Sequence, residues 1–411
     1  MITDQTQQTA TTFASLGIAE DLVAELDAQG ITSPFPIQEM TINDALASRD
    51  ITGKAKTGSG KTLAFGLPMI MHVTKAEPKR PQGLVLVPTR ELAVQVTRAL
   101  TPLLKLRDLT AVSVYGGAPM GPQVDALKRG ASIAIATPGR LIDLLERKAV
   151  DPRDIKIVAI DEADQMADMG FMPQVRAIMS QIPEDRQTFL FSATLDHQVQ
   201  ELIDRYMIDP VNHEVESETE TVDSMEHRFL KVHYMDKAKV VQELSRHNDR
   251  ILAFTRTKAG ADRLSRDLRE LGVAAAPIHG DLPQKKREQS LNRFSDGEVK
   301  VLVATNVAAR GLHIDGVDVV VHFDPPDDPK TYLHRSGRTA RAGEEGLVVT
   351  LVEWDQVNEV LGIQRRADLN VPIVKMFSND ERLADLSTWT PPPEEAPFTQ
   401  KSIKKRKRRG F

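Results

Sequence analysis

The stretch "IKIVAIDEAD" at residues 155–164 decides the fold class, because an unbroken apolar run ends abruptly in acidic residues. A run that is apolar on both faces is typical of a parallel strand covered by helices on both sides. Four similar runs lie in the same part of the chain: "LVLVP" (84–88), "LTAVSVY" (109–115), "SIAIATP" (132–138) and "TFLFSAT" (188–194). Helical patterns alternate with them. The sequence therefore predicts an open α/β sheet whose ligands bind beyond the carboxyl ends of its strands.

The second half of the chain repeats this design. Its strand candidates are "RILAFT" (250–255), "VAAAPIH" (273–279), "VKVLVAT" (299–305), "VDVVVHF" (317–323) and "GLVVTLV" (346–352), followed by a helical pattern at 355–366. A length of 411 residues with 41% hydrophobic content also favours two domains. We predict a first domain at 1–207, a linker at 208–224, a second domain at 225–375 and a disordered tail at 376–411.

Composition excludes several classes of protein. The chain has no cysteine, so neither disulfides nor thiolate metal sites can form. The start "MITDQTQQTATTF" lacks the profile of a signal peptide, and no apolar run approaches the ~18 residues of a membrane span. We therefore expect a soluble, cytoplasmic protein.

The segment "AKTGSGKT" (55–62) has the form of a phosphate-binding loop that opens an apolar helix. Gly58 and Gly60 let backbone amides face phosphate oxygens, and the helix N-terminus adds its dipole. Lys61 can then reach the β and γ phosphates, and Thr62 can offer a hydroxyl to Mg²⁺. The strict motif G-x-x-x-x-G-K-[ST] fails at its first glycine, so a glycine-rich turn that only caps a helix is the alternative.

The acids of the opening stretch can supply a metal ligand and a residue that orients water beside the phosphate loop. Asp161 is predicted to hold Mg²⁺, which binds few carboxylates and keeps several waters. Glu162 is placed to orient or deprotonate the water that attacks the γ phosphate. Acids at a strand end are usually only solvated, but loop and acids in this order within one α/β domain predict nucleotide hydrolysis.

Together these motifs resemble those of the DEAD-box ATP-dependent RNA helicases of helicase superfamily 2, named for the letters at 161–164. The resemblance spans about residues 13–366, and the motifs follow the family's order. It implies an α/β protein of two tandem RecA-like domains that uses ATP and Mg²⁺, grips the backbone of single-stranded RNA and locally separates short RNA duplexes when its domains close. The short basic tail is similar to that of bacterial members.

The resemblance also implies nucleotide contacts. In "GITSPFPIQ" (30–38), Gln38 would hydrogen-bond the adenine and Phe13 would pack against it. The alternative for Gln38 is an ordinary surface residue in a proline-rich turn. The implied residues of the loop are Ala55, Thr57, Gly58, Ser59, Gly60, Lys61 and Thr62, and alanine at the first position is what the family has.

RNA contacts are implied at or beyond strand ends in both domains, where this family grips the sugar-phosphate backbone and reads little sequence. In the first domain they are Pro88, Thr89, Arg90, Gly116, Gly117, Thr137, Pro138, Gly139 and Arg140. In the second domain they are Arg256, Gly280, Gln284, Arg287 and Thr305. The segment "TPGR" (137–140) also suits a helix start, with threonine as cap and proline in the first turn.

The segment "HRSGRTARAG" (334–343) is implied to complete the ATP site. On domain closure Arg338 and Arg341 would act as arginine fingers on the γ phosphate, while His334 and Arg335 would make contacts across the cleft. The residues implied in coupling hydrolysis to RNA are Asp164, Ser192, Thr194 and His334.

Four positions depart from the family pattern: Lys56, Asn306, His313 and Ala340. His313 stands where an aspartate commonly contacts the ribose, so that contact is in doubt. Asp315, two residues on, is a candidate substitute, and a structural role is the favoured reading of His313.

The tail holds seven Lys or Arg and no acid between Lys401 and Arg409, so a net charge of −5 leaves −12 for the rest of the chain. We predict that this basic arm, including Lys404, Lys405 and Arg406, tethers RNA. A solubilising end and a nuclear address are the alternatives.

Two other functions use the same motifs: a DNA-acting translocase of the superfamily, and an ATP-dependent RNA clamp or scaffold that does not unwind. Gln38 with Phe13 speaks against the first. Candidate partners besides RNA are the machineries of ribosome assembly or RNA degradation, and no membrane contact is expected.

Overall fold

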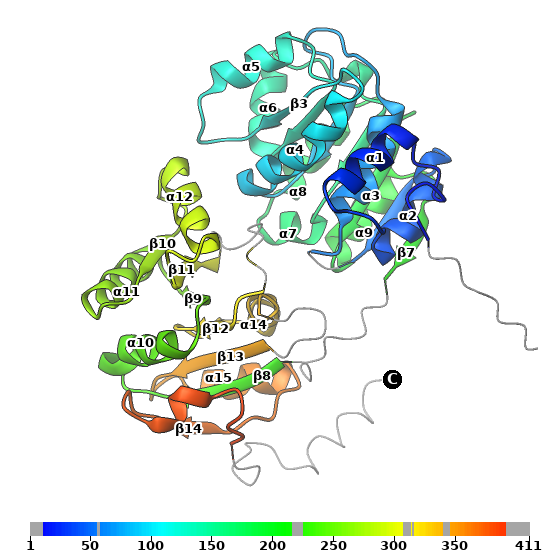
Figure 1. Cartoon of the computed structure of the whole chain (residues 1–411). Helices are drawn as coiled ribbons and strands as arrows, with labels where there is room; N and C mark the ends of the chain where they lie inside the picture. The colour runs from blue at the N-terminus through cyan, green and yellow to red at the C-terminus, as the bar shows by residue number, and fades with distance from the viewer. Residues whose placement is uncertain are drawn as a thin grey trace, which may run out of the picture. The chain divides into compact units, whose positions relative to one another are not determined.

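The computed structural model describes residues 11–55, 58–215, 225–306, 314, 316–339 and 346–391. It divides the chain into two units, Met1–Ser217 and Glu218–Phe411 (Figure 1). Within the described ranges, no helix has the length and apolar character needed to cross a membrane.

Unit 1 is built on a parallel sheet in the order β3-β4-β2-β5-β6-β1-β7. Its strands are β1 (Ile51–Lys54), β2 (Gly83–Leu86), β3 (Ala111–Val114), β4 (Ile133–Ala136), β5 (Ile157–Ile160), β6 (Gln187–Ser192) and β7 (Val211–Glu214). Its helices are α1 (Glu20–Ala28), α2 (Pro36–Leu46), α3 (Lys61–His72), α4 (Arg90–Lys105), α5 (Met120–Lys128), α6 (Pro138–Glu146), α7 (Ala163–Asp168), α8 (Met172–Met179) and α9 (His197–Tyr206), with a 3₁₀ turn, η1 (Pro152–Asp154).

Helices cover both faces of this sheet. Alternate residues of β5 point to opposite sides, so Ile157 and Ala159 join the core under α1 to α4, whereas Val158 and Ile160 join the core under α5 to α9. A strand buried on both faces must be apolar throughout, which is why the sequence shows unbroken runs rather than alternation.

Unit 2 repeats the topology seven strands later, in the order β10-β11-β9-β12-β13-β8-β14. Its strands are β8 (Met225–Lys231), β9 (Ile251–Thr255), β10 (Ala275–Ile278), β11 (Val301–Thr305), β12 (Val319–His322), β13 (Gly346–Val352) and β14 (Ile373–Lys375). Its helices are α10 (Lys237–His247), α11 (Lys258–Glu270), α12 (Gln284–Ser295), α14 (Pro329–Ser336) and α15 (Val357–Arg366), with 3₁₀ turns η3 (Tyr234–Asp236) and η4 (Glu381–Asp385). Helices α10 and α11 cover one face, and α12, α14 and α15 cover the other.

The predicted linker at 208–224 is wrong for its first part. Val211–Glu214 forms β7, which pairs in parallel with β1 at the edge of the sheet. Two side-chain contacts fasten it: Thr52 Oγ1 donates to Asn212 Oδ1 (2.5 Å), and Lys54 Nζ lies 2.5 Å from Glu214 Oε1. An edge strand exposes alternate residues, so its polar composition resembled a loop. Residues 216–224 lie outside the described ranges.

The predicted disordered tail at 376–411 is wrong for residues 376–391. Met376, Leu383 and Leu386 are buried in the core beside α10, and Arg228 Nε donates to the carbonyl of Leu386 (2.9 Å). The segment folds as one short 3₁₀ turn, which is too brief to produce a helical period in the sequence. Residues 392–411, with the basic arm, lie outside the described ranges.

Strand β8 was missed because its sequence "MEHRFLK" places polar residues in the interior. His227 and Arg228 are only 4% and 3% exposed. Arg228 is held by Glu226 Oε2 (2.5 Å) and backbone carbonyls. These hydrogen bonds, together with the one to the distant Leu386 carbonyl, allow a charged side chain to lie in a buried strand.

The core beneath α14 holds a buried group of polar rings. His322 stacks on Tyr332 with ring centroids 4.7 Å apart, and the Tyr332 hydroxyl lies 2.8 Å from His227 Nδ1. Burial, aided by the charge of Arg228, lowers the pKa of His227 to about 4. Burial also lowers the pKa of His322 well below its ordinary value. Both imidazoles are therefore neutral at pH 7.

These histidines predict that unit 2 loses stability in acid. His227 has a pKa of 6.5 in the unfolded chain and about 4 when folded, so its contribution is complete above 6.5 and is lost as the pH falls from 6.5 through 4. A shift of this size corresponds to about 3 kcal/mol. Urea unfolding followed by tryptophan fluorescence isolates this unit, because Trp354 and Trp389 are the chain's two tryptophans. His227→Gln, which can still hydrogen-bond Tyr332, should weaken the fall in stability between about pH 7 and 5. If His227→Gln loses as much stability between about pH 7 and 5 as the unsubstituted chain does, His227 is not the group responsible.

Candidate functional site

The carboxyl edge of the sheet in unit 1 divides into two halves. Strands β5, β6 and β1 are neighbours, and the acids at 161–164, the segment at 192–194 and the phosphate loop follow them. Strands β3, β4 and β2 are also neighbours, and the three candidate RNA segments follow those. Distant motifs meet because parallel strands end at one edge, so each half forms its own site.

The phosphate loop is anchored to strand β6 and to its own lysine. The backbone amide of Ala55 donates to the carbonyl of Ser192 (3.0 Å). Lys61, which is 6% exposed, donates from Nζ to the Ala55 carbonyl (3.1 Å) and lies 4.0 Å from Asp161 Oδ1. The loop thus presents Gly58, Ser59, Gly60 and Thr62 at the start of α3; Lys56 and Thr57 lie outside the described ranges.

Gln38 is bound to this loop and is not a surface residue. Its side chain is 1% exposed, accepts from the amide of Phe35 (2.9 Å) and donates from Nε2 to the Gly60 carbonyl (2.8 Å). Gly60 has φ +84°, and a Cβ there would lie 2.4 Å from Gln38 Nε2. Only glycine fits, so the segment at 30–38 and the phosphate loop form one unit.

The acids at 161 and 162 are buried beside Lys61. Asp161 is 2% exposed, and its Oδ1 accepts from the backbone amide of Glu162 (2.9 Å). Glu162 is 4% exposed and has a left-handed backbone, φ +53°, which costs a non-glycine residue about 1–2 kcal/mol. Strain of this kind concentrates at functional positions.

The residues predicted to couple hydrolysis to RNA fall into two groups. Ser192 Oγ accepts from the amide of Asp164 (3.1 Å) and donates to the Thr194 carbonyl (2.7 Å), while Thr194 Oγ1 donates to Asp164 Oδ2 (3.3 Å). These three residues form a closed ring in unit 1. His334 lies on α14 of unit 2, exposed to solvent.

Thr62 and Asp161 suit a Mg²⁺ ion that is shared with a bound nucleotide, and they are too few to hold a cation by protein ligands alone. Within the described part of the chain, no cluster of three or more His, Asp or Glu could hold a metal. Mg²⁺ is commonly held by one carboxylate, waters and the phosphates of its substrate. The donor set present, one carboxylate and one hydroxyl at a phosphate loop, fits that mode.

The three candidate RNA segments that follow β2, β3 and β4 contact one another. Arg90 lies against Gly117, where φ is +79° and a Cβ would be 2.4 Å from the guanidinium. Arg140 donates to the Ala118 carbonyl (3.2 Å). Thr89 caps α4 through the amide of Leu92 (3.3 Å), so its hydroxyl is already engaged. Pro88 is buried, whereas Gly116 and Gly139 have open space around them.

The segment at 137–140 does start a helix, as its alternative reading predicts, but Thr137 makes no side-chain cap bond. Thr137 is 9% exposed, and Pro138 occupies the first turn of α6. The helix start and an RNA contact through backbone groups remain compatible.

In unit 2 the candidate RNA residues follow β10, β11 and β9, again neighbouring strands. Gly280 is exposed, and its loop is joined to α11 by an ion pair between Lys258 and Asp281 (2.5 Å). Gln284 is partly exposed, on the first turn of α12. Arg287 and Thr305 are buried, 6% and 7% exposed, and offer little surface in this conformation.

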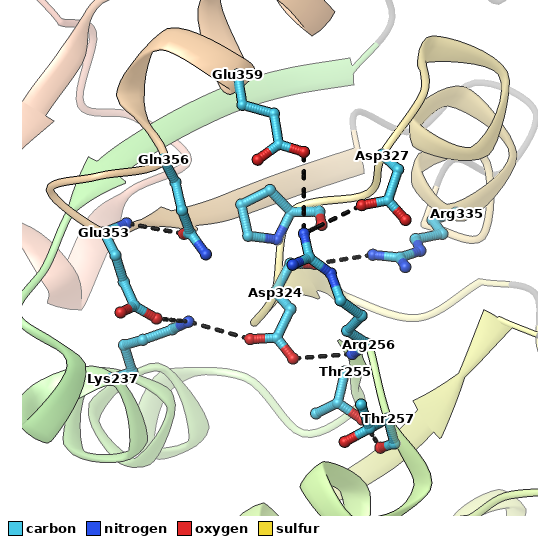
Figure 2. Close-up of polar contacts among 11 residues, drawn as sticks. Lys237, Thr255, Arg256, Thr257, Asp324, Asp327, Arg335, Glu353, Gln356 and Glu359 are labelled. Atoms are coloured by element: carbon cyan, nitrogen blue, oxygen red, sulfur yellow. Dashed lines mark hydrogen bonds and ion pairs between the residues drawn. The ribbon is translucent and has the colours of Figure 1, made fainter.

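Figure 2 shows a polar network around Asp324, a residue that sequence reasoning missed. Its carboxylate accepts from Lys237 Nζ (3.3 Å) and from the amide of Arg256 (2.8 Å), and its carbonyl accepts from Arg335 (3.0 Å). The guanidinium of Arg256 lies 3.1 Å from Asp327 Oδ1. An acid directly beyond the apolar run at 317–323 is the same signal that identified Asp161. The network ties the RNA segment after β9 to helix α14.

Lys237 and Asp324 occupy in unit 2 the places that Lys61 and Asp161 occupy in unit 1. Each lysine begins the helix after its strand, β8 or β1, and each aspartate follows the matching strand, β12 or β5. Lys237 is 2% exposed and also contacts Glu353 Oε1 (2.9 Å). Two carboxylates neutralise this lysine, so unit 2 lacks a free cation for phosphate at this position.

The prediction that Arg335 makes a contact across the cleft is wrong. Its side chain is 5% exposed and lies inside unit 2, where Nε donates to Asn306 Oδ1 (2.5 Å) and the guanidinium covers the ring of Phe254 (4.9 Å). Burial lowers the pKa of Arg335 to about 10, so it stays charged at pH 7. Arg338, one turn on, is partly exposed. Arg341, Ala340, His313 and Asp315 lie outside the described ranges.

Phe13, predicted to pack against the adenine, and Phe35, which was assigned no role, differ sharply in exposure. Phe13 is 1% exposed and packed in the core of unit 1, so its ring has no free face in this conformation. Phe35 is 52% exposed, and its Cδ2 would lie 2.8 Å from a Cβ at Gly60. The sequence analysis assigned no role to Phe35; an aromatic residue between two prolines, three positions before Gln38, was the available signal.

Comparison with known proteins finds a helicase family model that matches part of each unit. Residues 35–202 match the DEAD/DEAH box helicase model, and residues 236–343 match the helicase conserved C-terminal domain. The DEAD-box ATP-dependent RNA helicase CshA of Bacillus cereus is 40% identical over 375 residues, or 91% of this chain and 71% of that protein. CshA of Bacillus subtilis is 37% identical over 374 residues, or 90% of this chain and 76% of that protein.

Solved structures agree. Dbp5 of S. cerevisiae, bound to RNA and ADP BeF3, matches with a TM-score of 0.78 and 30% identity over 90% of this chain and 97% of that chain. A DEAD box protein from Methanococcus jannaschii matches with a TM-score of 0.51 and 30% identity, covering 89% of this chain.

The contact at Gly60 predicts that Gly60→Ala will impair nucleotide binding, because the new methyl group must displace Gln38 and strain the backbone. Affinity for a fluorescent ATP analogue should fall by about tenfold or more, given a backbone cost of about 1–2 kcal/mol in addition to the collision. Gly121→Ala is the matched control, since Gly121 has open space around it and an ordinary φ. Equal affinity in both variants would contradict this reading.

Proposed function

The chain belongs to the DEAD-box ATP-dependent RNA helicases, and from that premise we propose which of its residues bind ATP, which bind RNA and how the two are coupled. Membership confirms the family, the RecA-like fold class and the enzyme class expected from the sequence. The observation that carries the proposal is the division of the carboxyl edge in unit 1 into an ATP half and an RNA half.

ATP binds unit 1 on the phosphate loop. Gln38 reads the adenine edge by exchanging one of its contacts with Phe35 and Gly60 for the base, and Phe35 offers the exposed aromatic face against which the base packs. Lys61 contacts the β and γ phosphates, and its existing contact with the Ala55 carbonyl keeps its ammonium inside the loop. Mg²⁺, held by Thr62 and Asp161, would neutralise charge on the phosphates.

Hydrolysis needs a water oriented by Glu162 and charge supplied from unit 2. Glu162 is held by its strained backbone next to Asp161, so its carboxylate is positioned before substrate arrives. Arg338 and Arg341 reach the γ phosphate when the domains close, and such fingers contribute about 10³ to 10⁵ in rate in related enzymes. ATP is hydrolysed at the site on unit 1 and not at the matching place on unit 2, because two carboxylates neutralise Lys237 there.

RNA binds the other half of each edge through Arg90, Arg140 and Arg256 with nearby backbone amides. Two networks then couple RNA to hydrolysis. In unit 1 the ring of Asp164, Ser192 and Thr194 joins the acids to strand β6. In unit 2 Asp324 joins the segment of Arg256 to α14, which ends at Ser336, two residues before Arg338. Closure on RNA therefore completes the ATP site, and hydrolysis reopens it.

Strand displacement on a short RNA duplex tests the function as a whole. Displacement with ATP, reduced by a non-hydrolysable analogue and absent on DNA, is the expected result. RNA-dependent ATPase without displacement would assign a clamp, and displacement of DNA would assign a translocase. Cytoplasmic location and partners in ribosome assembly or RNA degradation stay predictions.

Glu162→Gln and Arg338→Ala should separate binding from chemistry. Glu162→Gln keeps the shape of the side chain but cannot orient the water as a carboxylate does, so ATP and RNA binding should persist while turnover falls by about 10² or more. Arg338→Ala should lower turnover by about 10³ with little change in ATP affinity. Steady-state RNA-stimulated ATPase and equilibrium nucleotide binding measure both effects. Near-normal turnover in either variant would remove that residue from the mechanism.

Phe35→Ala should weaken ATP binding about fivefold or more, because stacking of a base on an aromatic ring is worth about 1–3 kcal/mol. Phe35→Tyr should retain affinity. Met40→Ala, on helix α2 directly after Phe35 and 39% exposed, is the matched control. The reading fails if Phe35→Ala binds ATP as the control does.

Deleting residues 400–411 should weaken RNA binding and flatten its dependence on salt, while ATPase without RNA stays unchanged. Seven phosphate contacts on a single strand set an upper bound of about 5 on the slope of log affinity against log salt. RNA binding measured across about 50 to 200 mM salt gives the slope directly. An identical slope in both chains would reject the tether.

A further inference from the structure

The carboxyl ends of β13, β8 and β14 carry an exposed surface that the ATP and RNA motifs do not use. Trp354 is 80% exposed and Phe377 is 54% exposed. Lys231 Nζ lies 4.2 Å from the centroid of the Trp354 ring, and Lys375 Nζ lies 4.8 Å from that of Phe377. We call these four residues the aromatic–lysine patch.

The patch lies on one face of the sheet. Lys231 of β8 and Lys375 of β14 are register partners, so their side chains point the same way. Lys231 is also the register partner of Val352, which lies two residues before Trp354. Each pair of lysine and ring therefore lies directly beside the other, at the end of the sheet opposite to β10, β11 and β9.

The two lysines carry positive charge that the described residues do not neutralise. Across the ranges described, neither Lys231 nor Lys375 forms an ion pair, whereas Lys237 and Lys239 nearby each contact a carboxylate. Two large exposed rings in a soluble domain commonly mark a binding surface. The patch therefore suits an occupant that is apolar and acidic.

The chain itself supplies such a segment at the place where its description ends. Trp389 packs under the guanidinium of Arg382 (5.1 Å), and Arg382 donates to the carbonyl of Lys375 (3.5 Å). Trp389 therefore lies near the end of β14, packed against the core beneath α10, and Pro391, two residues on, is buried. The following residues, 392–398, read "PPEEAPF".

We propose that residues 392–398 dock on the aromatic–lysine patch of the same chain. Three prolines favour the polyproline II conformation, which aromatic-lined surfaces recognise. Glu394 and Glu395 meet the two unpaired lysines. Seven residues in this conformation span about 20 Å, which exceeds the spacing of about 5 Å between β8 and β14.

Covalent linkage makes weak contacts sufficient. A segment already attached next to its site has an effective concentration in the millimolar range, so an intrinsic Kd of that order leaves it docked about half of the time. Prolines reduce the ordering cost further. Docking of residues 392–398 would bring the start of the basic arm close to unit 2. The proposal does not depend on what that arm binds.

Acrylamide quenching of Trp354 tests the proposal. The variant Trp389→Phe leaves Trp354 as the chain's one tryptophan, and the full chain is compared with a chain that ends at residue 391. Docking should shield Trp354, so its quenching constant should rise about twofold on truncation. Equal constants in the two chains would overturn the proposal.

A charge swap supplies the control and does not rely on the tryptophan substitution alone. Glu394→Lys with Glu395→Lys should expose Trp354, and adding Lys231→Glu with Lys375→Glu should restore its protection. Lys239→Glu, at a paired lysine outside the patch, should have no such effect. Failure of the second pair of changes to restore protection would reject a direct contact.

Titration of the truncated chain separates the other occupants. A synthetic peptide of residues 390–400 should protect Trp354, whereas a single-stranded RNA oligonucleotide should not. Protection by RNA in place of the peptide would assign the patch to nucleic acid. Quenching that depends on protein concentration would assign the patch to a second copy of the chain. Protection by RNA and dependence on protein concentration would each overturn the proposal.

Discussion

Parallel strand pairing is the constraint on which both functions depend. In each unit all strands of the sheet end at one edge, so segments far apart in sequence become neighbours there. Adjacency within the sheet then decides which segments share a site. Strands β5, β6 and β1 bring together the segments of the proposed nucleotide site, and β3, β4 and β2 bring together those of the proposed RNA surface. The two groups are adjacent, because β2 pairs directly with β5.

Buried charges hold these sites in position. Lys61 and Asp161 lie 4.0 Å apart with 6% and 2% exposure, and Lys237 lies between two carboxylates in unit 2. Buried ions are costly unless paired, so each network admits few arrangements. Among the described residues, Lys61 contacts one backbone carbonyl and lies 4.0 Å from one carboxylate, an arrangement that a phosphate can supplement. Unit 2 satisfies its lysine internally. The same topology therefore leaves the two lysines in different electrostatic surroundings.

Most of the sheet strands and the site segments could be predicted because their signals are local. Apolar runs covered on both faces, glycines at a phosphate loop and acids at a strand end depend on neighbouring residues alone. Strands β7 and β8 were missed because partners distant in sequence satisfy their polar groups, as Asp50 does for the backbone before β7 and Leu386 for Arg228. Residues 376–391 were misread because Leu383 and Leu386 bury themselves without a regular period.

The sequence by itself determined the fold class, the two-unit repeat, the family and the residue types that bind phosphate, since each follows from a pattern along the chain. Only the tertiary structure decided that Gln38 is bonded to the phosphate loop, that Phe35 rather than Phe13 is exposed next to it, and that Arg335 is an internal residue. Exposure and pairing depend on which segments pack together across the fold, and no local pattern encodes them. The opening stretch at 155–164 indicated where the chemistry lies, and packing determined which residues can reach it.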